Sequence, residues 1–198
     1  MKLVFASNNA HKLDEVRAMM PAGVKVLSLH DIGFEHEIDE TGTTLAENSK
    51  IKAETVVEWL KAHNQWSLVD GVFADDTGLE IDALGGQPGV YTARWAGEPA
   101  ANRAKALQEL ADKDNRNCQF KTVITLIMNG KTTQVEGIVR GKMATEEFGE
   151  GGFGYDPIFI PEGYDKTFGE LPAEIKNHIS HRARAMAKLV ELLKIYDY

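Results

Sequence analysis

This sequence of 198 residues has only one cysteine, no long apolar run and no surplus of basic residues. Its single cysteine, Cys118, excludes an internal disulfide and suits a reducing compartment. It stands beside Phe120 in a strand-like run without an evident histidine partner, so we interpret it as a core residue. No run approaches the ~20 apolar residues that span a bilayer, and the first apolar run is too short for a signal peptide. We therefore expect a cytoplasmic protein without a membrane partner.

Acidic residues outnumber basic ones, 30 to 22, which gives a net charge of −8. A nucleic-acid-binding surface needs a basic face, so we expect no nucleic-acid partner. A small phosphate ligand is still compatible with this charge, because nearby cations or a metal ion outweigh screened distant charges. The remaining composition, 43% hydrophobic and 26% charged, is ordinary for a soluble globular protein.

Apolar periodicity predicts strands that alternate with helices in the first half of the chain. We expect strands at residues 3–6, 24–29, 68–74, 79–81, 119–128 and 132–140. We expect helices at residues 13–20, 44–63, 100–113 and 180–196, and a long loop at 84–97. Asn129-Gly130 is a strong hairpin signal between the last two strands. The pattern indicates an α/β fold, a mixed sheet with flanking helices, in a single domain over residues 1–198.

The segment Ser7–Lys12 follows the first strand and leads into a helix. Ligands of open α/β sheets bind at that edge, and the free N–H groups and dipole of a helix N-terminus favour an anion. Lys12 adds a point charge suited to phosphate. The sequence thus indicates a phosphate site, although the glycines of a Walker loop are absent. The alternative is a strand–helix turn with an asparagine cap and a solvated lysine.

Two acidic pairs stand near predicted element ends: Asp75-Asp76 after a strand, and Asp39-Glu40 before the long helix. Adjacent carboxylates of this kind indicate a hard-cation site, a catalytic base or an Asx turn. Because neighbouring side chains of an extended segment alternate, we expect only one of Asp75 and Asp76 to face a cleft. Either pair alone is more typical of a turn, but together with Lys12 they favour Mg²⁺, which takes few protein carboxylates.

Lys52 and the glycine-rich segment with its aromatic residues are further candidates for the binding site. Lys52 shares a face of the long helix with Asn48, unless it is an exposed solubilising lysine. Gly149–Gly154 matches a dinucleotide fingerprint, which we reject because it precedes a strand. Its glycines allow a flat ligand to approach, and Phe153 or Tyr155 would stack on a base, unless they plug a flexible loop.

Ser180 is a good helix N-cap, and it places His181 and Arg182 in the first turn of the last helix. Cations at that position oppose the helix dipole. A nearby anionic ligand would remove the conflict, so the arrangement suggests a binding role. The alternative is plain surface charge.

Taken in order, these segments resemble the inosine triphosphate pyrophosphatase family over almost the whole chain. The landmarks are Ser7–Lys12, Glu40–Gly42, Glu47-Asn48 with Lys52, Ala74–Leu79, Leu84–Gly86 with Pro88-Gly89, Gly151–Pro157 and Ser180–Arg182. The resemblance implies an elongated two-lobed fold around a central cleft and a homodimer. It also implies Mg²⁺-dependent hydrolysis of noncanonical purine nucleoside triphosphates (ITP, dITP and XTP) to the monophosphate and pyrophosphate.

Residue roles also follow from the resemblance. It implies that Lys12 and Asp76 are catalytic, that Asp76 binds the metal, and that a second ligand comes from Asp39 or Glu40. The implied substrate contacts are Ser7, Asn8, Asn9, Ala10, His11, Lys12, Lys52, Thr77, Phe153, Gly154, Tyr155, Asp156, Lys176, His181 and Arg182, the last ones mainly at the base. Asn8 stands where glycine is common in the family, and Thr77 where serine is common. Rival hypotheses are a pyrophosphatase for modified pyrimidine nucleotides and a nucleotide sensor without hydrolysis.

Overall fold

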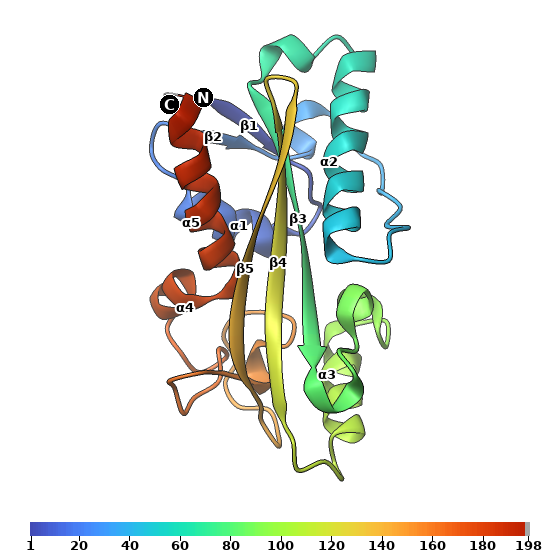
Figure 1. Cartoon of the computed structure of the whole chain (residues 1–198), viewed down its shortest axis with the longest axis vertical. Helices are drawn as coiled ribbons and strands as arrows, with labels where there is room; N and C mark the ends of the chain where they lie inside the picture. Colours follow the sequence, from blue (N-terminus) through green and yellow to red (C-terminus); the bar gives the residue numbers. More distant parts are fainter. Residues whose placement is uncertain (197–198) are drawn as a thin grey trace. The chain divides into compact units, whose positions relative to one another are not determined.

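The computed structural model describes residues 1–196, which form two compact units (Figure 1). Unit 1 consists of Met1–Asp76, Thr122–Glu136 and the C-terminal segment from Arg184. Unit 2 consists of Thr77–Lys121 and Gly137–Ala183. Each unit is therefore assembled from stretches that are distant in the sequence. None of the helices in the described residues is long and apolar enough to cross a membrane.

One mixed sheet of six strands runs through the chain, and the sequence predicts such a mixed sheet and five of the strands. The strands are β1 (Lys2–Phe5), β2 (Lys25–Leu27), β3 (Gly71–Ile81), β4 (Asn117–Met128), β5 (Lys131–Met143) and β6 (Phe159–Pro161). Their order is β2-β1-β3-β4-β5-β6, with β1 parallel to β2 and β3, and β5 antiparallel to β6. Between β4 and β5, Asn129 and Gly130 both have positive φ, which is what a tight hairpin turn requires.

Unit 1 has helices on both faces of its part of the sheet. They are α1 (Ala10–Met19), α2 (Leu45–Ala62) and, from Arg184 onward, α5 (His181–Leu193). Leu3 and Phe5 of β1 pack with α1 and α5, whereas Val4 packs with α2. The alternation of side chains along β1 therefore places α1 and α5 on one face and α2 on the other (Figure 1).

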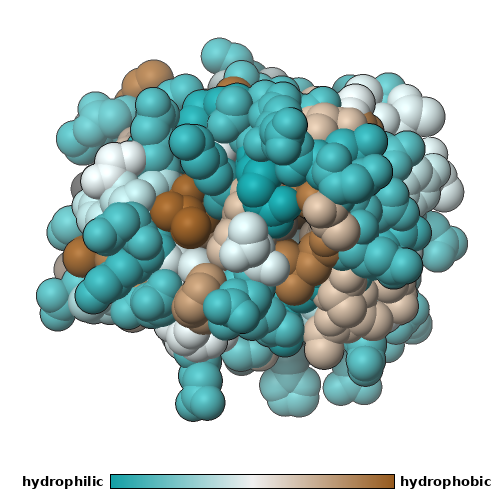
Figure 2. All heavy atoms as spheres, turned by 90° about the horizontal axis from the view of Figure 1, so that it is seen from below, coloured by the Kyte–Doolittle hydropathy of each residue, from teal (hydrophilic) through white to brown (hydrophobic). Residues whose placement is uncertain are grey.

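Unit 2 has its own apolar core. It is built on β6 and on the parts of β3, β4 and β5 that fall within residues 77–121 and 137–183. Helix α3 (Pro99–Glu109) packs on it through Ala106 and α4 (Ala173–Ile179) through Ile179. Phe120 and Phe159 meet edge to face in this core, with ring centroids 4.7 Å apart. On the face shown in Figure 2, hydrophilic side chains predominate and hydrophobic ones gather only in small groups.

The structure differs from the predicted secondary structure in three places. The strands expected at residues 68–74 and 79–81 form one strand, β3, because β4 lies beside it and overrides the local turn signal after the pairing with β1 has ended at Phe73. The expected loop at 84–97 contains a 3₁₀ turn, Gly89–Arg94. Helix α4 was not predicted, since seven residues are too few to show a helical apolar period.

The thiol of Cys118 lies fully buried in the core of unit 2, which confirms the core interpretation. Burial raises the pKa of this thiol to about 12, so only ~1 in 10⁴ molecules carries a thiolate at pH 8. The thiolate is the reactive species. We expect the native protein to react with Ellman's reagent at no more than about a hundredth of the rate of the guanidinium-unfolded protein, followed by absorbance. Rapid stoichiometric labelling of the native chain would contradict this burial.

Candidate functional site

The predicted phosphate loop forms the N-terminus of α1, directly after β1. Asn9 caps the helix: its Oδ1 accepts a hydrogen bond from the Lys12 amide at 3.1 Å. The Asn9 amide in turn donates to Ser7 Oγ at 3.1 Å. Asn8, Asn9, Ala10 and His11 are exposed here. This segment therefore presents an accessible, capped helix N-terminus, the arrangement that favours an anion.

Lys12 lies close to Asp75, one of the two aspartates of β3. Lys12 Nζ lies 3.1 Å from Asp75 Oδ1. The next residue, Asp76, takes a different partner, with its Oδ1 3.4 Å from Lys52 Nζ. Both carboxylates are buried, with exposed fractions of 1% for Asp75 and 7% for Asp76. The two neighbouring carboxylates thus have different lysines as their ion-pair partners, as the alternation of side chains along a strand favours.

Lys52 links the two acidic segments. Its Nζ lies 2.7 Å from Glu40 Oε1 as well as close to Asp76, and the residue is buried on α2. The alternative of a solvated lysine is therefore excluded. Asp39 is exposed, so the structure favours Glu40 over Asp39 as the acidic partner of Asp76. We call Lys12, Glu40, Lys52, Asp75 and Asp76 the lysine–carboxylate cluster.

Glu40 is held near this cluster by a contact that the sequence did not reveal. The Gly42 amide donates a hydrogen bond to Asn48 Oδ1 of α2 at 2.7 Å. A Cβ at Gly42 would lie 2.6 Å from that oxygen, so this close approach requires glycine. Thr44 caps α2 by accepting a hydrogen bond from the Glu47 amide, and the Glu47 carboxylate in turn accepts one from the Thr43 amide.

Charge in the lysine–carboxylate cluster is unbalanced, since three carboxylates face two lysines. Burial is the main cause that raises the pKa of Asp76, to about 6, against the opposing effect of Lys52 and Lys12. Burial acts to lower the pKa of Lys52, but the three carboxylates outweigh it and the pKa lies above its usual value. One more cation would therefore stabilise the cluster by balancing its net negative charge.

The donor atoms of this cluster fit a hard divalent cation. Asp76 Oδ2 is buried and has no hydrogen-bond partner among the described residues, a costly state that a bound cation would relieve. Within residues 1–196, no group of three or more His, Cys, Asp or Glu side chains forms a closed metal cage. Mg²⁺ needs none, because it retains water and takes phosphate oxygens beside one or two carboxylates. Asp76 and Glu40 are the two that would hold it.

A second group of predicted residues meets around the ring of Phe153 in unit 2. Lys176 Nζ lies 4.4 Å from the ring centroid, and the Arg182 guanidinium carbon 5.9 Å from it. Asp156 Oδ2 accepts hydrogen bonds from the Phe153 amide at 2.9 Å and from Lys176 Nζ at 2.6 Å. We call Phe153, Asp156, Lys176 and Arg182 the Phe153 cluster. Its half-buried ring and buried charges are suited to a flat polar ligand.

The first turn of α5 contains His181 and Arg182, as the cap at Ser180 predicts. Ser180 Oγ accepts from the Ala183 amide at 3.0 Å. Arg182 is 2% exposed and its Nη2 donates to Thr77 Oγ1 at 3.2 Å, which excludes the alternative of surface charge. His181 stacks on Phe120 with ring centroids 4.7 Å apart.

The two aromatic candidates of the glycine-rich loop differ in role. Tyr155 is buried, its hydroxyl donates to the Thr92 carbonyl at 2.6 Å, and burial raises its pKa. Its ring therefore belongs to the core of unit 2. Phe153 is the more accessible of the two, so the structure favours Phe153 as the stacking residue and Tyr155 as an anchor.

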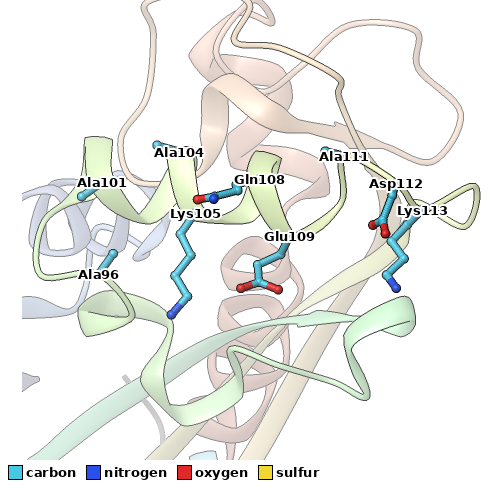
Figure 3. Close-up of a pocket in the computed structure, with 9 residues that line it drawn as sticks. All are labelled: Ala96, Ala101, Ala104, Lys105, Gln108, Glu109, Ala111, Asp112 and Lys113. Atoms are coloured by element: carbon cyan, nitrogen blue, oxygen red, sulfur yellow. The ribbon is translucent and has the colours of Figure 1, made fainter.

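A hollow of about 870 Å³ runs along α3 in unit 2 (Figure 3). Its lining is Ala96, Ala101, Ala104, Lys105, Gln108, Glu109, Ala111, Asp112 and Lys113. None of the predicted site residues and no aromatic side chain is among them. The hollow therefore lacks the stacking surface that a base requires, and the candidate site remains with the two clusters.

Each cluster suits one part of a nucleotide: in unit 1, a helix N-terminus with paired lysines and carboxylates suits a polyphosphate, and in unit 2, an aromatic ring beside two cations suits a base. The Ham1 family model matches residues 3–192, and the chain therefore belongs to the Ham1 family.

Similar proteins cover essentially the whole chain. A dITP/XTP pyrophosphatase of Flavobacterium johnsoniae is 48% identical over 98% of both chains, and one of Bacillus subtilis is 47% identical over 96% of both. Among solved structures, the Staphylococcus aureus Ham1 protein has a TM-score of 0.86 and 36% identity, with complete coverage of both chains. A nucleoside-triphosphatase, dITP/XTP pyrophosphatase, of Mycobacterium abscessus has a TM-score of 0.74 and 39% identity, covering 96% of this chain and 99% of its own.

Proposed function

We propose that this protein is a pyrophosphatase that hydrolyses ITP, dITP and XTP to the monophosphate and pyrophosphate, and so removes these nucleotides from the pool. The observation that carries the proposal is the lysine–carboxylate cluster at the N-terminus of α1, where Lys12 and Lys52 each meet a buried aspartate. Relatives of 47–48% identity bear the name dITP/XTP pyrophosphatase, which supports the choice of substrate.

The lysine–carboxylate cluster would bind the triphosphate. Lys12 and the N-terminus of α1 would neutralise phosphate charge, and Lys52 lies beside Glu40 and Asp76. Asp76 orients a water, or accepts its proton, for in-line attack on the α-phosphorus. A new bond forms from this water to the α-phosphorus, and the bond to the α–β bridging oxygen breaks, so that pyrophosphate leaves. A Mg²⁺ held by Asp76 and Glu40 would supply further charge neutralisation on the phosphate oxygens.

The Phe153 cluster would bind the base. The Phe153 ring offers a stacking surface, and Lys176 and Arg182 carry N–H donors for a purine carrying a 6-oxo group. Asp156 holds Lys176 and the Phe153 amide in place. Thr77, hydrogen-bonded to Arg182, and His181 complete the substrate contacts proposed for unit 2.

Removal of divalent metal is expected to abolish the activity. Purified protein with ITP in excess EDTA should release pyrophosphate at least ~10²-fold more slowly than in Mg²⁺, because the unbalanced carboxylates of the cluster then repel the substrate. Adding Mg²⁺ beyond the chelator should restore the rate. The products should be inosine monophosphate and pyrophosphate, separated by ion-exchange chromatography. Undiminished turnover in EDTA would exclude Mg²⁺ from the reaction.

A panel of purine and pyrimidine triphosphates decides between this function and its rivals. Faster hydrolysis of modified UTP or CTP would favour a pyrimidine-directed pyrophosphatase. Tight ITP binding in Mg²⁺ without pyrophosphate release would favour a sensor. Retention of both Lys12 and Asp76 in one buried cluster supports catalysis over sensing.

We further propose that the protein acts as a homodimer in the cytoplasm, without nucleic-acid or membrane partners. The family resemblance supports the dimer, the single buried cysteine suits a reducing compartment, and the net charge of −8 disfavours nucleic acid. Light scattering coupled to size-exclusion chromatography measures the dimer directly.

A further inference from the structure

Arg103 of α3 joins two separate parts of the glycine-rich region in unit 2. Its Nε donates to Glu147 Oε1 at 2.6 Å, and its Nη1 donates to the Gly154 carbonyl at 2.8 Å. The planar guanidinium fixes the directions of both hydrogen bonds at once. Because the ion pair with half-exposed Glu147 is partly solvated, it adds little to global stability. Its effect is on where the Gly154 carbonyl lies.

The neighbouring residue, Asn102, holds the other anchor of the same loop. It is buried, its Oδ1 accepts from the Ala96 amide at 2.6 Å, and its Nδ2 donates to the Ala93 carbonyl at 3.0 Å. These bonds fix the segment that includes Thr92, whose carbonyl accepts the Tyr155 hydroxyl. Two consecutive residues of α3 therefore hold the loop: Arg103 bonds to Gly154 directly, and Asn102 holds Tyr155 indirectly through the segment that contains Thr92.

The loop depends on such external anchors. Gly152 and Gly154 both have positive φ, a conformation that glycine reaches readily and also leaves readily. A Cβ at Gly152 would collide with the Asp156 carboxylate, so the glycines are required for the turn even though they leave it pliable. The Phe153 ring lies between them in the chain, and its place beside Lys176 depends on both being held.

We propose that Arg103 is a positioning residue of the base site: through the Gly154 carbonyl it holds the Phe153 ring at the place where a base stacks. The functional half of this inference rests on the function proposed above. Within the described part of unit 2, the side-chain hydrogen bonds of Arg103 go to Glu147 and to the Gly154 carbonyl, and neither partner is a phosphate-binding residue or a member of the Phe153 cluster. Its loss therefore acts on base affinity and spares the chemical step.

The kinetic arm compares Arg103→Ala with Arg140→Ala. Arg140 is a matched control, because it also pairs with a carboxylate of unit 2, Asp82 at 2.9 Å, and its other side-chain hydrogen bond goes to Gln119 of β4 and not to the glycine-rich segment. Arg103→Ala should raise KM for ITP about tenfold and leave kcat within about twofold, whereas Arg140→Ala changes neither. Arg103→Lys keeps one donor and should recover part of the KM. A fall in kcat at constant KM, or equal effects in Arg140→Ala, overturns the proposal.

The structural arm needs no substrate. Hydrogen–deuterium exchange followed by mass spectrometry should show faster exchange in peptides covering residues 148–157 of Arg103→Ala, and unchanged exchange there in Arg140→Ala. The Phe153 amide, bonded to Asp156 in the native loop, should contribute to that gain. Unchanged exchange in Arg103→Ala overturns the positioning role. If wild-type protein fails to hydrolyse ITP, the proposed function fails, and this arm still decides whether Arg103 holds the loop.

Discussion

Asp76→Asn is expected to lower kcat for ITP by ~10²-fold or more. Asparagine keeps the shape of the side chain but cannot accept the proton of the attacking water, and it is a much weaker ligand for a hard cation. Asp76 is also the residue whose Oδ2 is left without a hydrogen-bond partner in the buried cluster. The measurement is pyrophosphate release at saturating ITP and Mg²⁺. Turnover close to wild type would remove Asp76 from the mechanism.

Asp75→Asn is the matched control at the adjacent position. Asp75 is buried against Lys12, so its loss disturbs a phosphate-binding lysine and should act mainly on KM. We expect kcat to fall less in Asp75→Asn than in Asp76→Asn. Equal losses of kcat in the two variants would indicate that only the total charge of the cluster matters.

Unfolding does not explain the expected loss of activity in Asp76→Asn. The folded-state pKa of Asp76, about 6, lies above the ordinary 3.8, so the folded protein binds the extra proton and loses stability as pH rises from about 4 to 6. Keeping this carboxylate ionised at pH 7 thus costs the metal-free fold on the order of 3 kcal/mol. Asparagine avoids that cost, and Lys52 keeps Glu40 as a partner. Metal-free Asp76→Asn should therefore unfold at a temperature no lower than wild type at pH 7.5.

The parts of the site that the sequence revealed are those built from neighbouring residues. A strand followed by a polar turn and a helix placed Ser7–Lys12 at a helix N-terminus, and the cap at Ser180 placed Arg182 in a first turn. Such features depend on local hydrogen bonds, which follow sequence spacing. For the same reason the Asn129-Gly130 hairpin was predictable.

Pairings between distant residues could not be predicted in this way. The choice of Glu40 over Asp39 depends on the reach of Lys52 from α2 and on the Gly42–Asn48 contact. Arg103 carried no signal, because an arginine on an amphipathic helix is ordinarily a solvated one. Likewise, β3 continues through its own turn signal because the neighbouring strand β4 supplies hydrogen bonds that no local pattern encodes.

The protein is expected to discriminate strongly between purine bases, with a kcat/KM for ITP ~10⁴-fold above that for ATP. Hypoxanthine carries a 6-oxo acceptor where adenine carries a 6-amino donor, so a buried protein donor aimed at this position is left unpaired with ATP. The Gly151 amide already donates to the Gly169 carbonyl, and the Phe153 amide to Asp156. Each of these amides has a single N–H, whereas Arg182 is buried and has five N–H donors, of which Nη2 supplies one to Thr77 Oγ1. We therefore take Arg182 as the candidate to test.

Arg182→Lys tests this assignment, because lysine keeps the charge but loses the planar fork of donors. It should lower kcat/KM for ITP by ~10- to 10²-fold and change the low activity on ATP much less, so that the ITP/ATP ratio shrinks. Arg184→Lys, an exposed arginine of the same helix, is the control and should leave the ratio unchanged.

GTP supplies the sharper comparison. Guanine shares the 6-oxo group, and only its 2-amino group separates it from hypoxanthine. If Arg182 binds the 6-oxo group, Arg182→Lys must lower the residual activity on GTP by about the same factor as the activity on ITP, while ATP is spared. An equal loss on ITP, GTP and ATP would mean instead that Arg182 contacts a part common to all three, the sugar or the phosphates, and that base choice is made elsewhere in the Phe153 cluster.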